Sequence, residues 1–172
     1  MPEEKELIER AVNGEESAYL KILNLYKGRI FSYILRLVKN YDDAEELTFD
    51  TFIKFFKSLK SFDTSKSLSS WLFKIAHNLV VDFFRRNTIE YEYLDERYSI
   101  SDNLAEKIEA QKRVERLEKA LGQLIPIDRE IIILFHREAL SYQEISNILK
   151  LPVSTIKTRL HRARKRLKKL LE

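Results

Sequence analysis

Apolar residues recur along almost the whole chain at the intervals of three and four that one face of an α-helix requires. The pattern runs from residue 3 to about residue 39, returns at residues 42–59 and 71–86, and fills most of residues 103–172. Only three glycines and three prolines interrupt it, and Leu, Ile, Glu, Lys and Arg dominate the remainder. The sequence therefore predicts an all-α fold.

Glycines, caps and loop formers mark the predicted helix ends in the first half. Gly14 and Gly28 are expected to divide the first stretch into two or three helices. Asp42 followed by Glu45 has the spacing of a capping box and predicts the next helix start. Residues 61–70 are rich in serine, threonine and aspartate, so we expect a loop there before the next helix.

The last part of the chain has the pattern of a helix-turn-helix. After predicted helices at residues 103–121 and 126–137, Ser141 and Glu144 form a second capping-box pattern at the start of a short helix. A turn at residues 150–152 then leads into a long helix, and we expect the proline of this turn to lie in the first helical turn. Two helices joined in this way are typical of DNA-binding modules.

Charge divides the chain into regions. Residues 87–110 carry seven acidic residues against two basic ones, a net charge of −5, where the helical pattern fades. A length of 172 residues fits one medium domain or two small ones. Because the faded stretch is the best linker candidate, we expect two small helical domains at residues 1–90 and 105–172, joined by an acidic linker at residues 91–104.

Positive charge gathers at the C-terminal end. Residues 150–172 hold nine Lys or Arg against one Glu, so this segment is +8 and residues 1–149 together are −4. A helical wheel places an apolar stripe on one side of the last helix and polar donors on the other. The donors predicted to bind DNA are Ser154, Thr155, Lys157, Thr158, Arg159, His161, Arg162, Arg164 and Lys165.

These donors divide by type and position. We expect Lys157, Thr158, His161 and Arg162 to reach base edges in the major groove. The flanking donors are expected to hold phosphates; they are Thr155, Arg159, Arg164 and Lys165. A basic helix that is only solvated is the alternative.

Several function classes lack their required residues. The chain has no cysteine, which excludes disulfides, thiol nucleophiles and zinc-cysteine sites. Its three histidines, His77, His136 and His161, share no ligand spacing, and no glycine-rich phosphate loop or nucleophile elbow occurs. We predict no catalytic residue, no metal and no cofactor. The acidic N-terminus and the short apolar runs predict no signal peptide and no membrane insertion, so we expect a cytoplasmic protein.

Two groups of segments together resemble one family. Residues 43–52, 71–78 (WLFKIAHN) and 82–86 (DFFRR) resemble region 2 of the sigma-70 factors of bacterial RNA polymerase. Residues 124–170, with DRE at 128–130, LSY at 140–142 and PVSTIKTRLHRAR at 152–164, resemble region 4. The absence of a domain between them is typical of the extracytoplasmic-function (ECF) group. The chain departs from the family pattern at Phe49, Lys150 and Ser154.

The resemblance implies a function and a set of partners. A sigma factor binds core RNA polymerase, recognises promoter DNA and directs its melting and the initiation of transcription. The resemblance places core-polymerase contacts at Leu47, Asp50, Phe52 and Ile53. It further implies that the acidic linker threads polymerase channels, with a merely disordered tether as the alternative, and that an anti-sigma factor sequesters both domains.

The resemblance also assigns DNA contacts. The helix-turn-helix is expected to bind the minus-35 element. Region 2 is expected to hold a base flipped from the minus-10 element, and its candidates are Phe62, Ser65, Lys66, Trp71, Lys74, Asn78, Arg85 and Arg86. A core role for Trp71 is the alternative to a base contact.

A different function remains open for the C-terminal part alone. A stand-alone helix-turn-helix regulator would account for residues 140–170, and such regulators bind palindromes as dimers. It would not account for the aromatic and amide residues of the first domain or for the acidic connector. The sequence thus favours a sigma factor over this regulator and over an enzyme.

Overall fold

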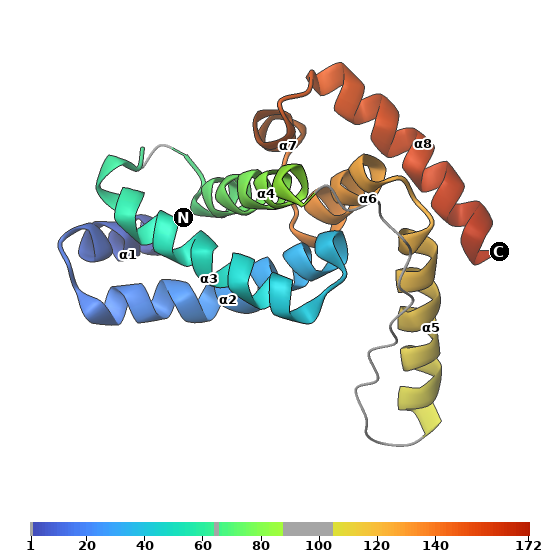
Figure 1. The fold of residues 1–172 in the computed structure, drawn as a ribbon, viewed down its shortest axis with the longest axis horizontal. Coiled ribbons are helices and arrows are strands. Elements are labelled where there is room, and N and C mark those ends of the chain that lie inside the picture. Colours follow the sequence, from blue (N-terminus) through green and yellow to red (C-terminus); the bar gives the residue numbers. More distant parts are fainter. Residues whose placement is uncertain (1, 64–65, 88–104) are drawn as a thin grey trace. The chain divides into compact units, whose positions relative to one another are not determined.

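The structure is a computed structural model that describes residues 2–63, 66–87 and 105–172, with side chains from residues 4 and 112 onward in the first and last ranges (Figure 1). Every regular element in these ranges is helical, which confirms the all-α prediction. The predicted linker at residues 91–104 lies outside the described residues.

The chain divides into two compact units. One unit contains residues 1–90 and 143–150, and the other contains residues 91–142 and 151–172. The division near residue 90 coincides with the predicted one, whereas residues 143–150 group with the first unit. The predicted domain limits therefore stay a prediction.

The first unit is built on three long helices that pack against one another. Helices α2 (Glu16–Val38), α3 (Tyr41–Ser58) and α4 (Leu68–Arg86) contact each other, and α1 (Pro2–Val12) packs on α2. A short 3₁₀ turn, η1 (Leu59–Ser61), ends α3. The rings of Tyr33 and Phe73 meet edge to face at 5.2 Å, and Tyr33, Phe55 and Phe73 are among the largest fully buried side chains.

The helix ends confirm some of the predicted boundaries and correct others. Gly14 lies in the turn after α1 with φ of +85°, a conformation that glycine adopts without strain. Gly28, by contrast, lies inside an unbroken α2, so a break there was wrong. Glycine inside a helix costs about 1 kcal/mol. Burial of Ile22, Ile30 and Ile34 on one face of α2 outweighs this cost.

Two helix starts lie earlier than predicted because serine and asparagine cap them. The Asn40 Oδ1 atom accepts a hydrogen bond of 3.0 Å from the Asp43 N–H, so α3 begins at Tyr41 instead of at Asp42. The Ser67 Oγ atom accepts one of 3.1 Å from the Ser70 N–H and starts α4 at Leu68. Helix α4 therefore takes up the last three residues of the loop predicted at residues 61–70, and Ser61, the first residue of that predicted loop, belongs to η1.

The second unit contains α5 (Ala105–Gly122), α6 (Pro126–Ile132), the π-helical turn η2 (Ile133–Arg137) and α8 (Val153–Leu171). Pro126 opens α6, as predicted. The buried guanidinium of Arg129 donates hydrogen bonds of 2.9, 2.8 and 3.1 Å to the carbonyl oxygens of Leu121, Gly122 and Leu124. These bonds satisfy carbonyls at the end of α5 and fix the turn into α6.

Helix α7 (Tyr142–Leu149) and α8 are joined by the predicted three-residue turn. Lys150 has φ of +54°, so it adopts the left-handed conformation that glycine tolerates without a Cβ penalty. Pro152 is the N-cap residue of α8, one position before the predicted first turn. Its missing N–H is still not needed there.

The strained turn generates a stability prediction. Lys150→Gly should raise the free energy of unfolding by about 0.5–1 kcal/mol, because the left-handed conformation then carries no Cβ penalty. Chemical denaturation followed by circular dichroism measures the change. Lys150→Ala is the matched control, since it removes the same side chain and keeps the Cβ atom. An equal gain in both variants would contradict a backbone origin.

Candidate nucleic-acid interface

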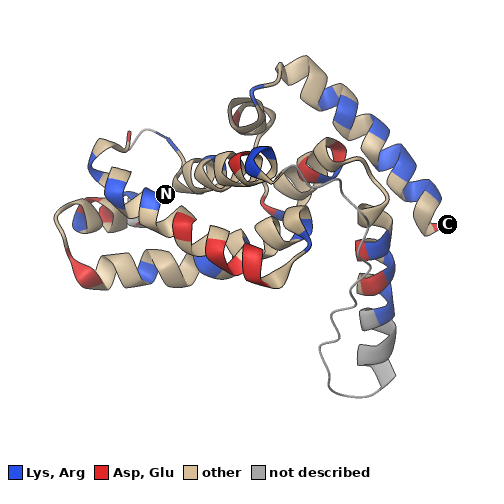
Figure 2. Cartoon of the chain, in the orientation of Figure 1, with Lys and Arg blue, Asp and Glu red and all other residues tan. Residues whose placement is uncertain are grey.

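Helix α8 has two chemically different faces. Its apolar face holds Ile156, Leu160 and Ala163, which are all buried. The rest of its surface is basic, and its Lys and Arg positions are coloured blue along the helix in Figure 2. The helix is therefore anchored by one side and leaves a cationic surface open to solvent.

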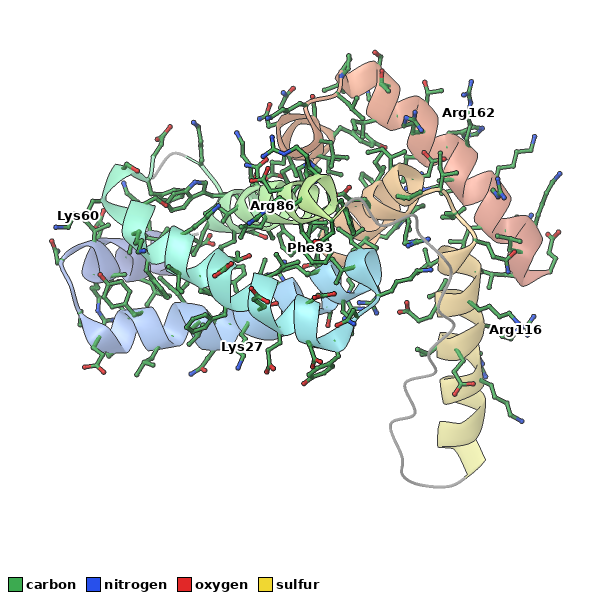
Figure 3. All side chains as sticks on the ribbon, in the orientation of Figure 1. Lys27, Lys60, Phe83, Arg86, Arg116 and Arg162 are labelled. Carbon is green, nitrogen blue, oxygen red and sulfur yellow. The ribbon has the colours of Figure 1, made fainter. Side chains whose placement is uncertain are left out.

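The predicted base readers lie on this open surface. Lys157, Thr158, His161 and Arg162 are exposed, as are Ser154 and Lys165 at the two ends of the predicted set. Figure 3 shows the side chain of Arg162 extending from α8. The Thr158 Oγ1 atom donates a hydrogen bond of 3.0 Å to the Ser154 carbonyl oxygen, so in this state the hydroxyl is turned toward its own helix.

Two of the predicted phosphate-binding arginines are held by residues that precede α8. The Arg159 Nη1 atom lies 2.9 Å from Asp128 Oδ1 on α6. The Arg164 Nε–H donates a hydrogen bond of 2.9 Å to His136 Nε2, and its guanidinium lies 5.1 Å from the centre of the Phe135 ring. Sequence reasoning missed Asp128 and His136 as neighbours of α8. They are 31 and 28 residues away from their partners, and no spacing rule covers such distances.

A hollow lies beside the first half of α8. It has a volume of about 420 Å³. Its lining residues come from α8, from α6 and from the turn before α6, and they are Ile125, Asp128, Ser154, Thr155, Thr158, Arg159 and Arg162. Most of this lining belongs to the set predicted to bind DNA. The hollow therefore gathers hydroxyls and guanidinium groups at one concave place.

In the first unit, the structure places Trp71 in an aromatic cluster. The Trp71 ring stacks on Phe62 with centroids 4.4 Å apart and planes 23° apart, and it meets the buried Phe55 edge on at 5.2 Å. Trp71 itself is half-buried. It is thus neither a fully buried core residue nor a free surface ring, and it belongs to a surface layer of stacked aromatics.

The remaining minus-10 candidates are exposed on or near α4. Lys74 and Asn78 follow Trp71 at helical intervals of three and four, so all three share one face of α4. The other exposed candidates are Lys66, Arg85 and Arg86. Lys66 lies 3.4 Å from Asp63, and Arg85 lies 3.1 Å from Asp82, both as surface ion pairs. Ser65 lies outside the described residues.

The predicted polymerase-contact residues divide into buried and accessible ones. Leu47 and Phe52 are 5% and 4% exposed, so they serve the core of the first unit. Asp50 and Ile53 are partly exposed. Phe49, which the sequence analysis noted only as a departure from the family, is 67% exposed on the same helix.

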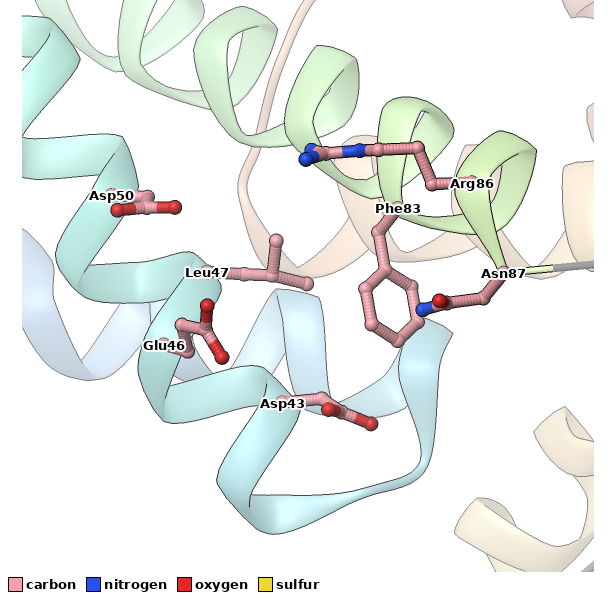
Figure 4. A pocket seen from close by; sticks show the side chains of 7 residues that line it. All are labelled: Asp43, Glu46, Leu47, Asp50, Phe83, Arg86 and Asn87. Carbon is pink, nitrogen blue, oxygen red and sulfur yellow. The ribbon is translucent and has the colours of Figure 1, made fainter.

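A second hollow lies between α3 and α4. It has a volume of about 300 Å³, and its lining residues are Asp43, Glu46, Leu47, Asp50, Phe83, Arg86 and Asn87 (Figure 4). Three carboxylates line its α3 side, and the same acidic stretch appears in red in Figure 2. This side of the first unit has the charge that attracts a basic partner.

Within the residues whose side chains are described, no group of three or more His, Cys, Asp or Glu could hold a metal ion. Among the described helices, none combines the length and the apolar character that crossing a membrane requires.

The His136–Arg164 contact generates a pH prediction. Burial lowers the pKa of His136 below its usual 6.5, and the nearby positive charge of Arg164 lowers it further. The unfolded chain thus binds this proton more readily than the folded chain. The free energy of unfolding should therefore fall as the pH drops below 6.5.

Denaturation at a series of pH values, compared between the parent and His136→Gln, isolates this effect. His77 and His161 are present in both proteins, and the glutamine keeps an acceptor without titrating. The parent should lose more stability than the variant between neutral pH and the lowered pKa. Parallel pH curves would contradict a hydrogen-bonded, neutral His136.

Comparison with known proteins finds a family match in each half of the chain. Residues 22–89 match the family model for Sigma-70 region 2, and residues 114–167 match the model for Sigma-70 region 4. The chain is 32% identical to the ECF RNA polymerase sigma factor SigW of Bacillus subtilis, over 97% of this chain and 96% of that protein. It is also 32% identical to the RNA polymerase sigma factor YlaC of the same organism, over 84% and 86% of the two chains.

A solved structure has the same fold. The sigma factor RpoE of Bartonella quintana, crystallised in complex with the anti-sigma factor NepR, aligns with a TM-score of 0.73 and 27% identity over 89% of this chain and 96% of that one. The two family models occur in the predicted order, and the relatives are similar along their length. The chain therefore belongs to the sigma-70 family of RNA polymerase sigma factors, in its extracytoplasmic-function group.

Proposed function

We propose that this chain is a transcription initiation factor that binds core RNA polymerase, recognises promoters through two DNA elements and assists their melting. The observation that carries the proposal is the combination of two units in one chain. One presents a basic helix anchored by its apolar face. The other presents stacked aromatics beside exposed donors on α4. In this proposal the chain catalyses no reaction of its own, because the polymerase makes the RNA.

Region 4 binds the minus-35 element with α8 in the major groove. The exposed side chains of Lys157, His161 and Arg162 reach base edges, and arginine matches the acceptors of guanine. Arg159 and Arg164 lie to the sides, where they neutralise phosphates. Since α8 is anchored by buried residues, the reading side chains keep a fixed register on the DNA.

Region 2 holds the melted minus-10 element. Extruding a base from the duplex costs a few kcal/mol. Stacking an unpaired base on an aromatic ring returns about 1–3 kcal/mol. Phe62 and Trp71 form a preassembled aromatic surface for this purpose, with Lys74 and Asn78 on the same side of α4 as Trp71.

Core polymerase binds α3 in this proposal. The exposed Phe49 supplies an apolar contact, and Asp50 lies with other carboxylates that favour a basic surface. Leu47 and Phe52 act indirectly, because their burial fixes α3 on the core of its unit. The acidic linker stays a separate prediction for the polymerase channels that hold RNA.

An anti-sigma factor is the proposed regulator. The relative from Bartonella quintana was crystallised with one, and this chain covers 96% of that protein. Sequestering both units would block polymerase and DNA together. We propose the cytoplasm as the place of action, because core polymerase and chromosomal DNA are found there.

Run-off transcription tests the proposed function directly. Core RNA polymerase should start transcripts at defined sites on genomic DNA only when this chain is added, and the mapped promoters should share two dissimilar elements. The matched control is core polymerase alone. Absence of any new start site with any bacterial core polymerase would contradict the proposal.

Two substitutions in α8 separate base reading from electrostatics. Arg162→Ala should reduce discrimination of the minus-35 sequence by roughly 1–3 kcal/mol, because it removes a base contact. Lys168→Ala should weaken binding to all sequences alike and reduce the salt slope by about 1. Binding of the holoenzyme to specific and scrambled duplexes at several salt concentrations measures both. Equal loss on all sequences in both variants would contradict the assigned roles.

A further inference from the structure

An acidic residue lies on the DNA-binding side of the second unit. Asp128 lines the same hollow as Ser154, Thr155, Arg159 and Arg162, all of which are predicted to bind DNA. A carboxylate close to DNA repels the phosphates. Its presence among residues that bind a polyanion therefore requires a compensating role.

The geometry connects Asp128 to one of these donors. The Asp128 Oδ1 atom accepts a hydrogen bond of 2.9 Å from Arg159 Nη1. Asp128 is 17% exposed and Arg159 is 37% exposed, so the pair is partly shielded and the guanidinium still reaches solvent. The remaining N–H groups of Arg159 donate to no protein group among the described residues, which leaves them available to a ligand.

The carboxylate itself is held on a fixed support. Asp128 precedes Arg129, whose guanidinium ties α6 to two carbonyl groups at the end of α5 and to one in the turn that follows it. Helix α6 also packs directly against α8. A long arginine side chain normally loses rotamer freedom when it binds. An arginine already held by a fixed carboxylate loses less of this freedom and presents its donors in one direction.

We propose that Asp128 is a positioning residue, which holds Arg159 so that the guanidinium meets one phosphate of the upstream promoter element in a fixed place. This contact sets the register of α8 on the DNA, because phosphate contacts fix orientation and base contacts then specify the sequence. The proposal rests on the proposed function, in which region 4 binds the minus-35 element.

The direction in which Asp128→Asn changes the affinity for DNA tests this role. Asp128→Asn removes a negative charge near DNA, so electrostatics alone predicts tighter binding to every sequence. A positioning role predicts the opposite for the correct element, with about tenfold weaker binding. Binding to scrambled DNA should stay unchanged or tighten slightly, because a mobile arginine can still reach some phosphate.

The experiment uses the full chain with core RNA polymerase. Dissociation constants are measured on a duplex from a promoter mapped by run-off transcription, and on the same duplex with its upstream element scrambled. Glu115→Gln is the matched control, since it removes one exposed carboxylate of the same unit that does not line the hollow. It should leave the ratio of the two constants unchanged.

The same substitution made in the Arg159→Ala variant separates a positioning role from a loss of folded structure. In Arg159→Ala, the further change Asp128→Asn should have no effect on that ratio, because the side chain to be positioned is gone. Thermal unfolding of each variant measures folding independently. A further fall in the ratio in the Arg159→Ala background would overturn the proposal, and so would tighter binding of Asp128→Asn to the specific duplex. If the parent holoenzyme bound both duplexes equally, the proposed function itself would fail.

Discussion

The proposed DNA-binding surface depends on burial of one face of α8. Without that burial, a helix as basic as residues 153–171 would gain little from folding, since its charges repel one another. Ile156, Leu160 and Ala163 bury their side chains in the second unit and compensate for this repulsion. The same burial determines which donors remain outside. The register of the buried stripe along α8 therefore decides which side chains are exposed for the proposed contact with DNA.

The two units are both helical, but they present different kinds of surface. In the second unit, the helix proposed to bind DNA, α8, is supported by residues of α6 and η2 that hold two of its arginines. In the first unit, a layer of aromatic side chains extends from the buried Phe55 through the half-buried Trp71 to Phe62. A stacked layer of this kind offers flat apolar surface near solvent, which suits an unpaired base better than a duplex.

Local patterns predicted much of this structure from the sequence. The all-α class and the helix-turn-helix follow from periodicity, from Pro126 and from the turn at residues 150–152. Gly28 was misread because its local cost is small beside the tertiary burial of α2. The start of α3 was misplaced because Asn40 and Asp42 are both residue types that cap helices, and the structure uses Asn40. The pairs Asp128–Arg159 and His136–Arg164 could not be predicted, since they exist only after α6 and η2 pack on α8.

In the proposed function, two units of one chain contact two separate stretches of promoter DNA while bound to polymerase. Footprinting of a mapped promoter, with the chain alone, with core polymerase alone and with both together, tests it most directly. Two dissimilar protected stretches, at the minus-35 and minus-10 elements, should appear only when chain and core polymerase are both present. A symmetric footprint over a palindrome, produced by the chain alone, would contradict it.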